Sequence, residues 1–87
     1  MVDATLMEFP CRFSIKAFGK QDAAFEQTVF DLVRVHVPEL ERDDLQQKAS
    51  SGGRYVSVTV TIIARSKTQL DAIYQALTDH DAVIMSL

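Results

Sequence analysis

The sequence predicts an α+β fold, in which two helices cover one face of a four-stranded antiparallel sheet in a two-layer sandwich. The length of 87 residues allows one domain with a single core. Two stretches alternate between apolar and polar residues, as half-buried strands do, and two others repeat apolar residues at helical spacing. With two weaker strand candidates, the order along the chain is strand, helix, strand, strand, helix, strand.

The first strand and the first helix are predicted to follow each other directly. In RFSIKAF, residues 12–18, apolar side chains alternate with polar ones, and Gly19 is predicted to end the strand. Asp22 is a candidate N-cap, and Pro38 sets the helix end near Val37, because proline cannot continue a helix. The apolar stripe of this helix comprises Phe25, Val29, Leu32, Val33 and His36, with Phe30 at its edge.

The second half of the chain repeats this pattern after a polar connection. Residues 45–50 are a polar strand candidate, and residues 54–64 are the strongest strand. A second helix, capped by Ser66 or Thr68, is predicted to end around Asp79, and residues 82–87 form a last strand. The buried side chains of this half are predicted to be Val56, Val58, Val60, Ile62, Leu70, Ile73, Tyr74 and Leu77.

This order of elements is that of a ferredoxin-like βαββαβ domain with the strands in the spatial order 4-1-3-2. The two strands with the clearest alternation then lie at the centre of the sheet, and the polar second strand lies at an edge. Residues 1–11 are predicted to be an extended lead-in, and residues 12–87 to form the single domain.

The charge, the cysteine content and the hydropathy of the chain argue against several classes of function. The net charge of −3 argues against a general nucleic-acid-binding protein, which usually has a basic surface. Cys11 is the only cysteine, so no internal disulfide can form, which fits a reducing compartment. No segment approaches the ~20 apolar residues of a membrane span. We therefore expect a cytoplasmic protein that does not contact a membrane.

The sequence contains no recognisable catalytic or metal-binding constellation. Cys11 has no histidine near it in the sequence, and a cysteine nucleophile usually needs a paired base. His36 and His80 are scattered, without the spacing of metal ligands. We therefore expect a protein that is not an enzyme and that needs no metal or cofactor.

The cluster SSGG, residues 50–53, raises the question of a phosphate cradle. A cradle of the P-loop type places its glycines between a strand and the N-terminus of a helix, where N–H groups face the anion. Here the cluster leads into a strand and lacks a following Gly-Lys-Ser or Gly-Lys-Thr. We interpret it as a hairpin turn whose glycines adopt positive φ.

Gly19 is a candidate for ligand binding, because it is predicted to separate a strand from a helix N-terminus. Lys20, Gln21 and Asp22 stand beside it. Together these four residues could hold a small anion or an amino-acid carboxylate, and the alternative is a plain strand-to-helix turn.

The uncovered face of the sheet is the second candidate site. It is predicted to carry small hydroxyl side chains at its centre with apolar side chains among them, and Lys16 is its one charged residue. A solvated antiparallel face usually carries more charge, so we predict a contact surface for a protein or a second copy, against the alternative of a solvated sheet. The predicted members are Ser14, Lys16, Phe18, Tyr55, Ser57, Thr59, Thr61, Ile63 and Ile84.

Several short motifs together resemble the YbeD-like family of small uncharacterised bacterial proteins. They are Glu8-Phe9-Pro10, the strand running to Gly19, SSGGRY at 50–55 followed by Ser57-Val58, and IYQAL at 73–77 before the closing apolar strand. The chain departs from the family pattern at Ala49, where a proline is expected, and at Gly52, where a lysine is expected.

The resemblance implies a ferredoxin-like fold similar to ACT regulatory domains, no established catalysis and a metabolic setting. ACT domains bind small molecules near the glycine turn after the first strand, and Gly19 is the matching position. We therefore expect a non-enzymatic regulatory or adaptor domain that acts through protein association. The alternative is a small-molecule sensor that binds an anion or an amino acid at the Gly19 turn.

Overall fold

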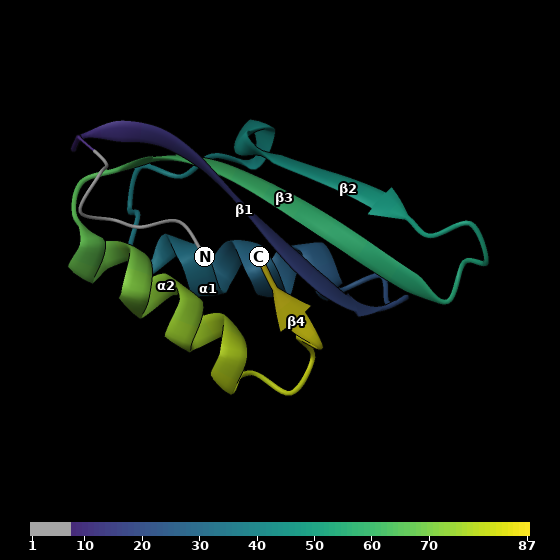
Figure 1. The fold of residues 1–87 in the computed structure, drawn as a ribbon. Coiled ribbons are helices and arrows are strands. Elements are labelled where there is room, and N and C mark those ends of the chain that lie inside the picture. The colour runs from purple at the N-terminus through teal and green to yellow at the C-terminus, as the bar shows by residue number, and fades with distance from the viewer. Residues whose placement is uncertain (1–7) are drawn as a thin grey trace.

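The structure, a computed structural model, describes residues 8–87. Its elements are β1 (Cys11–Lys20), α1 (Phe25–Arg34), the short 3-10 helix η2 (Arg42–Asp44), β2 (Leu45–Ala49), β3 (Tyr55–Ala64), α2 (Lys67–Asp79) and β4 (Met85–Ser86). The sheet is antiparallel with the order β2-β3-β1-β4, which is the predicted order read from the other edge. Both helices lie on one face of this sheet (Figure 1), so the predicted ferredoxin-like α+β fold is confirmed.

The register of the two central strands decides which side chains enter the core. β1 and β3 pair over ten residues each, from Cys11 opposite Ala64 to Lys20 opposite Tyr55. Side chains directly opposite each other share a face, so the predicted alternation of β3 is confirmed. The core side of the two strands is buried and comprises Ile15, Ala17, Val56, Val58, Val60, Ile62 and Ala64.

The helices begin close to the predicted positions. The Ser66 hydroxyl accepts a hydrogen bond from the backbone N–H of Gln69 at 3.1 Å and caps α2, which ends at Asp79. In α1 the N-cap position is Ala24, but the Asp22 carboxylate accepts the backbone N–H of Ala24 at 2.8 Å and so supplies the capping group.

Several boundaries and one burial prediction differ from the structure. α1 ends at Arg34, before the predicted end near Val37. The chain continues to Pro38 in turns, and the N–H of His36 donates to the carbonyl of Val33 in the first of them. Phe30 is buried and not at an edge, since the loop before β2 packs over α1 and places Arg42 above its ring. Cys11 belongs to β1 and not to a lead-in; residues 1–7 of that lead-in lie outside the described residues.

Gly19 lies inside β1, opposite Val56, so the prediction that it ends the strand is wrong. A Cβ atom at this position would clash with the Phe25 ring and would lie 2.7 Å from the carbonyl oxygen of Ala82. The first side chain of α1 therefore packs directly on the strand backbone, and only glycine leaves room for it. The glycine reflects tertiary packing and not a local turn.

We expect truncation of the central β3 valines to destabilise the fold strongly. Val58→Ala and Val60→Ala should each lower the free energy of unfolding by about 1–3 kcal/mol, because both side chains are fully buried. Thr59→Ala is the control, since Thr59 points to the other face. A larger loss for Thr59→Ala in urea denaturation would contradict the register.

We expect Gly19→Ala to destabilise the protein by about 1–3 kcal/mol, because the new methyl group overlaps the buried Phe25 ring. Gly52→Ala is the matched control, since a Cβ there meets nothing within 4 Å and its φ is not positive. Equal denaturation midpoints for the two variants would argue against this close packing.

Candidate functional site

The face of the sheet that the helices leave uncovered is the candidate site, called the open face below. The backbone register places on it all six residues predicted for the contact surface: Lys16, Phe18, Tyr55, Thr59, Thr61 and Ile63. Lys16 lies opposite Thr59, and Phe18 lies opposite Ser57. The Ser14 and Thr61 hydroxyls lie 3.3 Å apart, within hydrogen-bond distance, so a flat hydroxyl layer covers the middle of the face.

The edge strands add members that sequence analysis did not assign. Met85, and not Ile84, pairs with Phe18, so Met85 replaces Ile84 on the open face. Leu87 exchanges two backbone hydrogen bonds with Lys16, of 3.0 and 2.8 Å, and so lies opposite it. Lys48 of β2 lies opposite Ser57. A two-residue strand has too little alternation to reveal its register, so no sequence signal could have found Met85.

Large apolar side chains on the open face remain exposed. Tyr55 is 49% exposed, Ile63 48%, Met85 50% and Leu87 63%. Phe18, between Ser57 and Met85, is partly buried. Such a concentration of apolar area on one face of a small domain is typical of an interaction surface.

One end of the open face borders a hollow of about 310 Å³. β2 pairs with β3 only up to Val60, so the last part of β3 has no paired strand on that side among residues 8–87. The hollow is lined by apolar and charged side chains: Arg12, Val37, Glu39, Leu40, Asp44, Thr61, Ile62 and Ile63. A partner that contacts Thr61 and Ile63 on the open face could also contact the side chains of this hollow.

The predicted ligand-binding group at Gly19 has other roles in the fold. The N–H of Gln21 donates to the carbonyl of Arg54 at 2.9 Å, and the Asp22 carboxylate is engaged with the N–H of Ala24. The side chain of Lys20 points to the open face, opposite Tyr55. Neither of the two hollows described in this subsection is lined by these residues. A ligand site at this position stays a prediction.

The SSGG segment forms the β2–β3 turn, as interpreted from the sequence. The N–H of Gly53 donates to the carbonyl of Ser50 at 3.0 Å, and the Ser50 hydroxyl accepts the N–H of Tyr55 at 3.2 Å. Only Gly53 has positive φ, of 68°, so the prediction of positive φ at Gly52 is wrong. The Ser50 hydroxyl therefore orders the turn.

A second hollow, of about 520 Å³, lies between α1 and η2. The guanidinium carbons of Arg34 and Arg42 lie 5.7 and 4.8 Å from the centroid of the Phe30 ring that lines it. Asp31, Glu41 and Asp43 line the same hollow, so its charge is mixed and points to no particular ligand.

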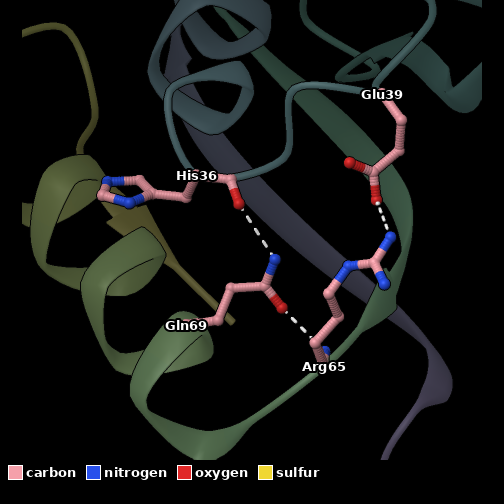
Figure 2. A network of polar contacts seen from close by, with 4 residues as sticks. All are labelled: His36, Glu39, Arg65 and Gln69. Carbon is pink, nitrogen blue, oxygen red and sulfur yellow. Dashed lines mark hydrogen bonds and ion pairs between the residues drawn. The ribbon is translucent and has the colours of Figure 1, made fainter.

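Gln69 is the centre of a polar network that joins both helices to the sheet (Figure 2). Its amide N–H donates to the His36 carbonyl beyond the end of α1 at 2.9 Å, and its amide oxygen accepts the Arg65 N–H at 2.7 Å. The Arg65 guanidinium also pairs with Glu39 at 3.0 Å. A backbone hydrogen bond and this arginine hold the pKa of Glu39 below its usual range, so its small stabilising effect is lost as pH falls through that lowered pKa.

The groups that could support catalysis serve other purposes or stand apart. His80 accepts the Ala82 N–H on Nδ1 at 3.1 Å, which orders the turn after α2. Burial raises the pKa of the Tyr74 phenol, so this hydroxyl stays protonated near neutral pH. Cys11 is a partly buried free thiol packed against the core. Within residues 8–87, no three His, Cys, Asp or Glu side chains gather as metal ligands would.

Among the helices of residues 8–87, none has the length and apolar character to cross a membrane.

The fold and the open face define a small ferredoxin-like α+β domain with one exposed sheet surface. The chain belongs to the family described as "Protein of unknown function (DUF493)", whose model matches residues 4–87. This assignment agrees with the resemblance to the YbeD-like proteins.

Similar proteins are small bacterial chains of comparable length. The UPF0250 protein NE1487 of Nitrosomonas europaea is 44% identical over the whole of both chains. A UPF0250 protein of Chromobacterium violaceum is 48% identical, covering 94% of this chain and 92% of that one. The solution structure of protein HP0495 from H. pylori has a TM-score of 0.70 and 13% identity, and covers 93% of this chain and 85% of that chain. This last likeness supports the fold alone.

We expect Gln69→Ala to lower the free energy of unfolding by about 1–2 kcal/mol, because it removes two hydrogen bonds and leaves the partly buried His36 carbonyl without this partner. Gln75→Ala, in the same helix, is the matched control. The Gln75 amide bonds only the exposed Asp79 carboxylate, so its loss should cost under about 0.5 kcal/mol. Equal losses in thermal or urea melts would contradict the bridging role.

Proposed function

We propose that this protein is a non-enzymatic adaptor or regulatory domain of bacterial metabolism that binds a protein partner through the open face. The observation that carries the proposal is the exposed apolar area of Tyr55, Ile63 and Met85 on a sheet face that no helix or strand of residues 8–87 covers. A sheet of this kind offers apolar anchors surrounded by polar groups, which is the composition of protein interfaces.

The shape of the domain supports binding by a surface. The chain has 87 residues, and a domain of this size has little material for a deep cleft after its core is formed. On the open face, Phe18 of β1 lies opposite Met85 of β4, and Tyr55 and Ile63 lie towards the two ends of β3 with hydroxyl side chains between them. We place this activity in the cytoplasm, supported by the single free cysteine and by the bacterial relatives.

The double variant Thr59→Glu with Thr61→Glu tests the proposal. Both side chains point away from the core, so the variant should keep its unfolding midpoint while its binding weakens at least about tenfold, since two charges must be desolvated on association. Pull-down from the source cells and sedimentation of the purified protein report the binding.

The control is Thr68→Glu with Thr78→Glu, which places the same charges on exposed positions of α2. Partner recovery and sedimentation of this control should match the wild type. If the open-face variant keeps the same mass and the same set of partners, the open face is not the working surface.

A further inference from the structure

Every charged residue in the four strands is basic. β1 contains Arg12, Lys16 and Lys20, β2 contains Lys48, and none of the strands contains Asp or Glu. The chain has nine Lys and Arg residues and twelve Asp and Glu residues, and every acidic residue within residues 8–87 lies outside the strands. The protein has a net charge of −3 and nevertheless keeps its sheet free of negative charge.

The register directs all four basic side chains to the open face, so the prediction that Lys16 is its one charged residue is wrong. Arg12 lies opposite Ile63, Lys20 opposite Tyr55, and Lys48 opposite Ser57. These three side chains and Lys16 are all exposed. The two ion pairs found within residues 8–87 lie elsewhere, between Arg65 and Glu39 and between Lys67 and Asp71. The positive charge of the open face is therefore available to a partner.

Basic and apolar side chains lie together on the half of the face nearest the β2–β3 turn. Lys48, Ser57, Phe18 and Met85 form one row across the four strands, and the next row contains Lys16 and Leu87. A molecule bound there would contact lysine ammonium groups and neighbouring apolar side chains at the same time. A complementary surface needs both carboxylates and apolar groups.

We propose that the partner bound by the open face is an acidic protein surface that also exposes apolar side chains. The inference rests on the proposed function and adds the chemistry of the partner. It argues against a second copy seated face to face, because such a contact would press two surfaces of the same sign together, and like charges in an interface are unfavourable.

A single-stranded nucleic acid is the other polyanion that a basic sheet could bind, using aromatic side chains as stacking platforms. The open face has two aromatic side chains, Phe18 and Tyr55, and three aliphatic ones, Ile63, Met85 and Leu87. Aliphatic side chains stack poorly on bases but pack well against apolar protein side chains. The aliphatic share of the open face therefore favours a protein over a nucleic acid.

Nuclear magnetic resonance titration of the isotopically labelled protein with two defined polyanions tests this inference. Poly-L-glutamate represents an acidic polypeptide, and poly(U) represents single-stranded RNA. We expect poly-L-glutamate to shift the backbone amide signals of β1 and β3 but not those of α1 and α2, with binding that weakens as salt is added.

Two charge variants complete the design. Lys16→Glu with Lys48→Glu should weaken poly-L-glutamate binding at least about tenfold, and Lys67→Glu, on α2, should leave it unchanged. All three positions are exposed, so the spectra should otherwise stay those of the folded protein.

Each alternative outcome is decisive. Stronger binding of poly(U) to the same signals would replace the protein partner with a nucleic acid. No shift with poly-L-glutamate, or equal effects of the two charge variants, would overturn the acidic partner. If the acidic partner is overturned but the Thr59→Glu, Thr61→Glu variant still fails to recover a partner in the pull-down, the open face binds a protein of other chemistry.

Discussion

The ten-residue antiparallel pairing of β1 with β3 is the constraint on which the rest of the structure depends. It aligns the valines of β3 with Ile15 and Ala17 beneath the helices and aligns Thr59 with Lys16 on the other side. A slip of one residue would exchange the two sets, burying hydroxyls and lysines and exposing the valines. The core and the open face are therefore two consequences of a single register.

Two contacts hold the helical layer on this sheet. Phe25 packs against the backbone of β1 at Gly19, and the Gln69 amide links the end of α1 to the junction of β3 and α2. With both helices on the same side, one side of the four-stranded sheet is filled, and no helix or strand of residues 8–87 lies over the other side (Figure 1). An open face is the direct result of this layering, and its side chains can be chosen for binding without disturbing the core.

The separation of charge follows the same two layers. Within residues 8–87, the acidic residues lie on helices, turns and loops, whereas every charged residue of the strands is basic and lies on the open face. Charge of one sign on a flat surface attracts a partner of opposite sign and orients it before contact, while the apolar side chains between the lysines supply the energy of the bound state. A small domain can obtain a specific binding surface in this way without a cleft.

The sequence by itself determined the elements whose signals are local. The alternation from Val56 to Ile62 and the Ser66 cap each depend on residues close together in the chain, and with the order of elements they predicted the fold class and most of the open face. Tertiary structure alone decided which residue of the short last strand faces Phe18, since two residues show no period. It also decided that Gly19 accommodates a helix and does not end a strand, and that Phe30 is buried under the loop before β2. These features depend on groups distant in the sequence, and a local pattern contains no information about which distant group will pack against it.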